Sequence, residues 1–315
     1  MNSPTYLFTA TIVTLTIVTL TIVTIYHISK INQPQPQPPR DDVLVIIYET
    51  DLTNDHLKTF EKTLTHNKYR YDVISDTKWK GFGGKIKRLQ KHLKGLHPEQ
   101  IVLISDARDV LSVNHESSEL YAKIRSDVDD NIIISTEIGC CVPAKFKPGG
   151  MRTSGGKVLK RTYDKSHETK NANYDNEWKE MFKKRAGKQN IKHNIDYKQS
   201  IYLNAGVYAG KVKTLLRIYA MMNIADKEDD QLIMSEIFYH HPKMFKLDYN
   251  REIFSNSHVW DTNNSKEGSK DSGCNYIKDN GKITDTYLNS TPFFIHTPGK
   301  HFKCYDYVHG MINLK

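Results

Sequence analysis

The stretch Ile101-Val-Leu-Ile-Ser-Asp-Ala-Arg-Asp-Val-Leu111 decides the fold that we expect for this chain. It opens with an uninterrupted apolar run, which is typical of a strand buried on both faces of a parallel sheet. Asp106 and Asp109 follow this strand directly, three residues apart. Because ligands of open α/β sheets bind at the carboxyl ends of the strands, we expect a ligand site at these two carboxylates.

Similar segments surround this stretch on both sides. Apolar runs predict strands at 43–48, 71–75, 100–105 and 131–135, with amphipathic helices at 54–64 and 85–93 between them. This β-α-β-α-β order predicts a doubly wound α/β sheet. Farther along, we expect a strand at 202–210, helices at 211–222 and 229–239, a polar loop at 265–280 and a late strand at 292–296.

Composition limits the partners of the chain. It has 315 residues, 38% of them hydrophobic, and a formal net charge of +9. Residues 145–195 read as a basic insertion on the ligand face of the sheet, since from Lys145 to Lys192 there are 14 Lys and Arg against 5 Asp and Glu. Basicity allows nucleic acid, anionic lipid or a phosphorylated ligand. No zinc-finger spacing or RNP sequence is visible, so we expect no nucleic-acid partner.

The N-terminal part predicts a membrane anchor and a spacer. Residues 6–28 carry no charged side chain apart from His27 and are long enough to cross a bilayer as one helix. A cleaved signal peptide is the alternative, but it favours a basic N-terminus and a shorter apolar stretch. The Pro/Gln-rich residues 33–39 suit an extended stalk. We therefore divide the chain into an anchor (1–28), a stalk (29–41) and a globular domain (42–315).

The four cysteines are Cys140, Cys141, Cys274 and Cys304. They show no spacing of the kind that binds zinc. Cys274 and Cys304 either form a disulfide in an oxidising lumen or stay as free thiols.

Two acidic pairs and one histidine carry the expected chemistry. Asp106 and Asp109 make a hard-oxygen site for Mn²⁺ or Mg²⁺; the alternative is that Asp106 caps a helix and Asp109 pairs with a basic neighbour. Asp229 and Asp230 begin a helix, where the macrodipole alone favours acidic residues. His296 ends an apolar strand, and a lone histidine there is more often structural than a ligand.

A possible phosphate site precedes these pairs in the chain. Gly83, Gly84 and Lys85 open a helix, whose free N–H groups and lysine suit a phosphate. The match is weak, because the phosphate-loop pattern is absent. Trp79 either stacks on a base or packs against the protein.

Six stretches taken together resemble one family. They are TKWKGFGGKIKRLQKHL (77–93), IVLISDARDVL (101–111), IIISTEIGCCVPA (132–144), YLNAGVYAG (202–210), EDDQL (228–232) and FFIHTPGK (293–300). In this order they are similar to the glycosyltransferase domain of the multifunctional procollagen lysyl hydroxylases. The resemblance implies a GT-A type fold with a Rossmann-like, doubly wound mixed sheet, a UDP-sugar donor and Mn²⁺.

The resemblance also assigns roles to positions of this chain. It implies that the metal ligands are Asp106, Asp109 and His296. It implies that Asp229 and Asp230 are the acidic helix start essential to transfer. The donor-binding positions that it implies are Trp79, Gly84, Lys85, Asn204 and Lys300.

Two departures from the family pattern bear on substrate choice. Ala107-Arg108 stands where the family has a Ser/Ala-Tyr pair, which removes an aromatic partner for uracil. Cys141-Val-Pro stands where it has Cys-Trp-Pro, which removes an aromatic on the acceptor side. No H-x-D with a distant His is visible, so we expect no lysine hydroxylation.

The expected function is therefore transfer of glucose or galactose from a UDP-sugar to a hydroxyl acceptor. By the resemblance, the acceptor is hydroxylysine or galactosyl-hydroxylysine of a collagen-like protein. We expect a single-pass membrane protein with a catalytic domain in the ER or Golgi lumen, or associated with virions if the source is viral. The alternative is a non-catalytic, membrane-anchored glycan- or lipid-binding protein on a glycosyltransferase fold.

The anchor can be tested by fractionation. We expect the full chain to stay in the membrane pellet through alkaline extraction, because residues 6–28 are long and uncharged enough to span the bilayer. A variant that lacks residues 1–37 serves as the control and should be released. Recovery of the full chain in the soluble fraction with its N-terminus intact would show that the anchor assignment is wrong.

Overall fold

The computed structural model describes residues 38–137, 182–184, 201–257, 274–298 and 302–314, together with Thr21 and Glu180. Pro38–Lys315 is one compact unit. The predicted anchor except Thr21, residues 33–37 of the stalk and nearly all of the 145–195 insertion lie outside the described residues. Within the described part of the chain, no helix has the length and apolar character needed to cross a membrane.

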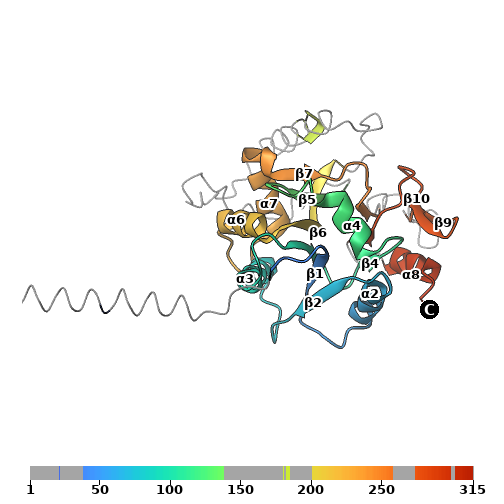
Figure 1. Ribbon diagram of the computed structural model, residues 1–315, viewed down its shortest axis with the longest axis horizontal. Coiled ribbons are helices and arrows are strands. Elements are labelled where there is room, and N and C mark those ends of the chain that lie inside the picture. The colour runs from blue at the N-terminus through green and yellow to red at the C-terminus, as the bar shows by residue number, and fades with distance from the viewer. Residues whose placement is uncertain are drawn as a thin grey trace, which may run out of the picture. The chain divides into compact units, whose positions relative to one another are not determined.

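A six-stranded mixed sheet forms the centre of this unit (Figure 1). β1 pairs in parallel with β2 and β3, whereas β6 runs antiparallel between β3 and β5. The predicted mixed α/β architecture is therefore confirmed. In spatial order the strands are β2 (Arg70–Ile74), β1 (Val43–Tyr48), β3 (Ile101–Ser105), β6 (Tyr202–Lys211), β5 (Ile132–Glu137) and β7 (Phe245–Leu247).

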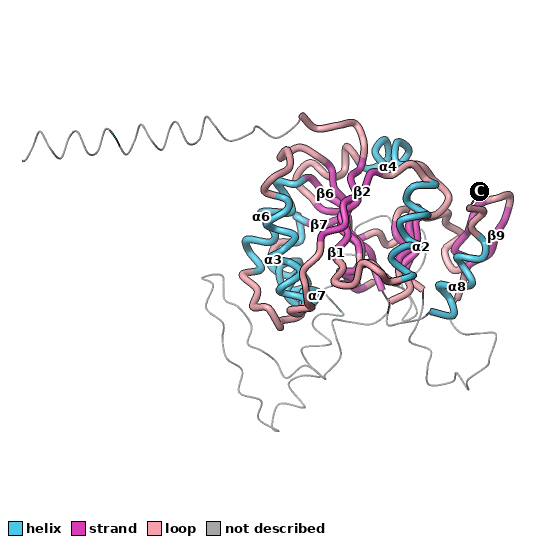
Figure 2. The backbone as a smooth tube through the Cα atoms, turned by 90° about the horizontal axis from the view of Figure 1, so that it is seen from below, coloured by secondary structure: helices cyan, strands magenta, loops and turns pink. Residues whose placement is uncertain are grey.

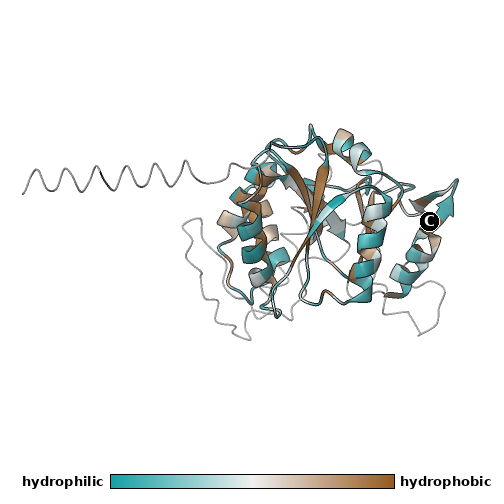
Figure 3. Cartoon of the chain, turned by 60° about the horizontal axis from the view of Figure 1, so that its bottom comes forward, coloured by the Kyte–Doolittle hydropathy of each residue, from teal (hydrophilic) through white to brown (hydrophobic). Residues whose placement is uncertain are grey.

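Helices cover both faces of this sheet, and the apolar strands lie between them (Figures 2 and 3). Strand β1 is buried throughout and sends alternate side chains to opposite faces. One face packs against α3 (Phe82–Leu93), α6 (Val212–Met222) and α7 (Asp230–His240). The other face packs against α2 (Asp55–His66) and α4 (Ser117–Ile124).

A second, three-stranded sheet lies beside α2. Its order is β4 (Val110–Ser112), β11 (Phe294–His296) and β8 (Phe254–Asn256), with β11 antiparallel to β4 and parallel to β8. A third apolar cluster joins this sheet to α8 (Phe302–Met311) and to the hairpin of β9 (Tyr276–Asp279) and β10 (Lys282–Asp285).

Several predicted boundaries need correction. The polar loop expected at 265–280 is wrong at its end, because β9 pairs there with β10. The sequence gave no sign of β4 or α4, which are short and follow the Asp106–Asp109 turn. A short 3-10 helix (Pro242–Met244) leads from α7 into β7.

Helix α3 also starts three residues earlier than predicted, at Phe82. Gly81 has φ of 105°, which favours glycine. Gly83 then lies in the first turn, where a Cβ atom would overlap the backbone oxygen of Ala225. The glycines therefore permit close packing of the helix start on the loop before α7.

Cys274 and Cys304 form a disulfide, which the sequence had left open. It links the segment before β9 to α8, and Cys304 is fully buried. The bridge therefore stabilises the outer layer of the three-stranded sheet.

Loss of this disulfide should destabilise the protein. Closing a loop of 30 residues predicts that Cys304→Ala lowers the free energy of unfolding by roughly 3–4 kcal/mol. Urea titration of the variant and of the wild type, each with and without dithiothreitol, measures the effect. The reductant should lower the stability of the wild type and leave that of the variant unchanged; an unchanged wild type would mean that the thiols are free.

Candidate active site

Asp106, Asp109 and His296 come together at one edge of the two sheets. Asp106 follows β3, Asp109 precedes β4, and His296 is the last residue of β11. Their ligand atoms lie within 4.8 Å of one another. The predicted juxtaposition of these three residues is therefore confirmed.

Hydrogen bonds fix the imidazole of His296 in one orientation. The side-chain amide of Asn256 donates to the carbonyl of Thr136 at 2.7 Å, so its oxygen faces the Nδ1 atom of His296 at 2.8 Å. Nδ1 therefore carries the proton, and Nε2 is directed toward the carboxylates. Nε2 is buried without a hydrogen-bond partner among the described residues and lies 3.5 Å from Oδ2 of Asp109.

This arrangement fits a divalent cation. Two carboxylates and an imidazole nitrogen held by a hydrogen bond on its other side are a common ligand set. Burial lowers the pKa of His296, but the nearby carboxylates of Asp109 and Asp106 outweigh it and leave the pKa raised. A positive charge, whether a proton or a metal, is thus favoured between these residues.

Gly206 makes the close approach of His296 possible. A Cβ atom at this position would overlap the imidazole ring. The carbonyl of Gly206 also accepts a hydrogen bond from the backbone N–H of Asp106 at 2.8 Å. One glycine of β6 therefore positions two of the three ligands, a role that the sequence reasoning missed although it quoted the YLNAGVYAG stretch.

Lys85 lies beside the cluster and joins both acidic pairs. Its ammonium is 3.2 Å from Asp106 and 2.7 Å from Asp230, and the side chains of Lys85 and Asp230 are almost fully buried. Burial lowers the pKa of Lys85, but these two carboxylates raise it more, so the group stays charged. The predicted donor lysine is therefore a fixed cation at the edge of the metal cluster.

Asp229 has the structural role that its position suggested. Its carboxylate accepts from the N–H of Leu232 at 2.8 Å and caps α7. Burial raises its pKa to about 6. The capping role does not test whether Asp229 also takes part in transfer.

Glu137 is a residue of this site that the sequence reasoning did not select. It ends β5, as Asp106 follows β3, and this strand-end position was the available signal. Its carboxylate accepts hydrogen bonds from Asn204 at 2.9 Å and from Gln231 at 2.5 Å. Burial raises its pKa to about 6, against the opposing effect of these two donors. Asn204, a predicted donor-binding residue, thus holds Glu137 in place.

The other predicted donor residues have different settings. Trp79 is half exposed and lies 5.9 Å from the ring of Tyr48, so one face can receive a ligand. The expectation of a free N–H at Gly84 is wrong, because this group donates to the carbonyl of Asp226 at 3.2 Å. Its place in donor binding stays a prediction. Lys300 lies outside the described residues.

Arg108, which stands where the family has an aromatic residue, is held by Glu49. Its guanidinium makes two parallel hydrogen bonds, at 2.7 and 2.6 Å, to the two carboxylate oxygens of Glu49. This fork geometry keeps the guanidinium planar and in place. The Arg108 side chain remains nearly half exposed beside the metal cluster.

Comparison with known proteins identifies the class. Residues 190–312 match the family model described as the PLOD GT domain. The resemblance to the procollagen lysyl hydroxylase glycosyltransferase domain is therefore confirmed over this part of the chain, and it supports glycosyltransferase as the class of protein.

Other comparisons add less. One solved structure is similar, the crystal structure of a glycosyltransferase involved in the glycosylation of the major capsid of PBCV-1. The similarity covers 86% of this chain and 100% of that one, with a TM-score of 0.41 and 10% sequence identity. None of the curated proteins matches the chain.

Substitution of Gly206 tests the metal cluster. We expect Gly206→Ala to displace the His296 ring and to weaken Mn²⁺ binding about 10- to 100-fold, the usual effect of disturbing the support of a metal ligand. Calorimetric Mn²⁺ titration measures it.

Gly210→Ala is the matched control, since a Cβ there would lie 2.7 Å from Ile132 Cγ2, on the same strand but away from the cluster. It should cost stability and leave Mn²⁺ affinity unchanged. Equal Mn²⁺ affinities of the two variants would contradict the assignment of His296.

Proposed function

We propose that the protein transfers glucose or galactose from a UDP-sugar to a hydroxyl acceptor, with Mn²⁺, or else Mg²⁺, at Asp106, Asp109 and His296. The observation that carries the proposal is the unpartnered Nε2 of His296 facing two carboxylates at the end of β3. A divalent cation held there would neutralise the charge that develops on the departing diphosphate.

The residues around the cluster divide the remaining work. Lys85, charged and fixed between Asp106 and Asp230, can bind a phosphate oxygen of the donor. Trp79 offers an exposed aromatic face to the base or sugar. Glu137 and Asp229, each with a pKa near 6, are suited to orient the acceptor hydroxyl and to accept its proton near neutral pH.

The acceptor and the location rest on different support. The family match is the support for hydroxylysine or galactosyl-hydroxylysine of a collagen-like protein as acceptor. The Cys274–Cys304 disulfide supports an oxidising compartment, such as the ER or Golgi lumen. The charge-free segment at residues 6–28 supports attachment of the domain to a membrane.

Two carboxylates should fail in different ways if this proposal holds. Asp106→Asn removes an oxygen ligand, so Mn²⁺-dependent UDP binding should weaken at least about 10-fold. Asp230→Asn should leave UDP binding nearly unchanged and lower turnover on the order of 100-fold or more, because its carboxylate is proposed to act in the transfer step. Calorimetric UDP titration and a UDP-sugar transfer assay separate the two effects.

Asp226→Asn is the matched control. Asp226 also pairs with a lysine of α3, Lys87, at 2.6 Å, but this pair is exposed. We expect the control to keep both binding and turnover, since exposed ion pairs contribute little. Near-normal turnover of Asp230→Asn would remove this residue from the proposed mechanism, and Mn²⁺-dependent UDP binding without any transfer would favour the non-catalytic alternative.

A further inference from the structure

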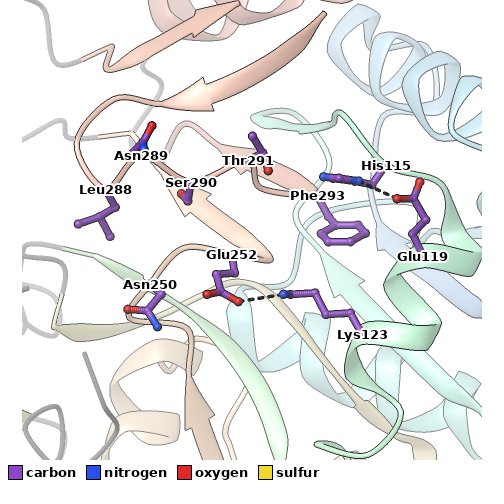
Figure 4. Close-up of a pocket in the computed structure, with 10 residues that line it drawn as sticks. All are labelled: His115, Glu119, Lys123, Asn250, Glu252, Leu288, Asn289, Ser290, Thr291 and Phe293. Atoms are coloured by element: carbon purple, nitrogen blue, oxygen red, sulfur yellow. Dashed lines mark hydrogen bonds and ion pairs between the residues drawn. The ribbon is translucent and has the colours of Figure 1, made fainter. Parts of the chain in front are cut away.

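A second cavity lies between α4 and the turn that follows β10 (Figure 4). Its volume is about 440 Å³, within the roughly 300–1,000 Å³ of small-molecule sites. A neighbouring cavity of about 660 Å³ shares three of its lining residues, Lys123, Asn250 and Glu252. The two cavities together can accommodate an elongated ligand.

This cavity is separate from the metal cluster. Both lie on the three-stranded sheet, but at opposite ends. His296 and Asn256 end β11 and β8, whereas Phe293 and Glu252, which line the cavity, precede these strands. At about 3.3 Å per residue, Phe293 lies ~10 Å along the strand from His296. A ligand in the cavity therefore occupies a different site from the donor.

The wall of the cavity is fixed by a buried ion pair. Arg251 and Asp285 are both fully buried and pair at 2.8 Å, and Ser255 donates to the same carboxylate at 2.6 Å. The other oxygen of Asp285 accepts from the N–H of Tyr287 at 2.9 Å, which holds the turn. A backbone bridge between Asp285 and Ser290 closes that turn. The lining is thus preorganised, which lowers the cost of binding.

Charge in the cavity is balanced within the lining. Lys123 pairs with Glu252 at 2.8 Å, and His115 contacts Glu119 at 3.0 Å (Figure 4). With two carboxylates against one ammonium and one imidazole, the cavity does not attract a phosphate or a sulfate. The balance favours a neutral ligand.

Polar groups in the lining lack partners that a ligand could supply. The hydroxyl of Ser290 is buried and has no hydrogen-bond partner within the described part of the chain. A buried hydroxyl left without a partner costs free energy, which a ligand that bonds to it restores. Thr291 adds a second hydroxyl, and Asn250 an amide. Donors and acceptors in close mixture match a molecule whose groups both donate and accept, as sugar hydroxyls do.

From these observations we propose that the cavity between α4 and residues 287–291 is a second carbohydrate site that binds a neutral oligosaccharide. It would hold a glycan remote from the metal cluster. This inference goes beyond the proposed transfer reaction and does not require it, because the site has its own lining and its own readout.

The test is direct binding of neutral and anionic sugars. Saturation-transfer NMR and calorimetry with lactose and maltotriose, compared with glucuronic acid and glucose 6-phosphate, are run on the full chain. The double variant Ser290→Ala/Thr291→Val removes two hydroxyls with little change in volume. Because the Ser290 hydroxyl has no partner in the protein, we expect unchanged thermal stability and at least about fivefold weaker binding of the neutral sugars.

The matched control is Ser235→Ala/Thr284→Val. Ser235 also carries a buried hydroxyl without a partner among the described residues, but it lies in α7, and Thr284 lies in β10 outside the cavity. It should bind the neutral sugars like the wild type. Asp106→Asn should also bind them normally, which separates this site from the metal cluster.

Three outcomes would overturn the proposal. They are no binding of either neutral sugar, equal binding by the cavity variant and the wild type, or loss of binding in Asp106→Asn. Failure of transfer activity would leave all three readouts unaffected, so the two proposals can fail independently.

Discussion

The close contact between Gly206 and His296 is the constraint on which the rest of the site depends. Strand β6 belongs to the large sheet and β11 to the small one, and the imidazole reaches the backbone of β6 only because this position has no side chain. The same residue accepts the N–H of Asp106 at the end of β3. The metal cluster is therefore assembled where two sheets meet, and its geometry depends on how tightly they pack.

Charge then explains why this edge is functional rather than structural. Lys85 and Asp230 form a nearly buried ion pair, with Asp106 as a second partner. A buried ion pair is often no more stabilising than apolar side chains of similar volume, because both ions lose their hydration. Lys85, the cluster of carboxylates and the raised pKa values of Glu137 and Asp229 are the perturbed groups expected at a reaction site.

The sequence predicted those parts of the fold that depend on local patterns. Apolar runs located β1, β3, β5 and β6, and a strand-end D-x-x-D with a strand-end histidine located the metal cluster, because both signals lie within a few residues. It could not predict the place of β6 between β3 and β5, which depends on contacts between distant segments. Glu137 and Gly206 were missed for the same reason, since their roles arise only from residues brought near by the fold.

The three-stranded sheet connects the two proposed sites physically. Its strands β4 and β11 carry Asp109 and His296 at one end and lead to His115 and Phe293 at the other. Asn114 joins the far end by donating to the carbonyls of Ile283 and Pro292 at 2.7 and 2.9 Å. The disulfide fixes α8 to the segment before β9 on the outer face of this sheet. Because the strands are short and held on all sides, the sheet sets a constant spacing between its ends. A glycan chain bound at the far end would therefore meet the metal cluster only if it passed around the sheet, which makes the distance along the molecular surface, rather than through it, the quantity that would select acceptor length.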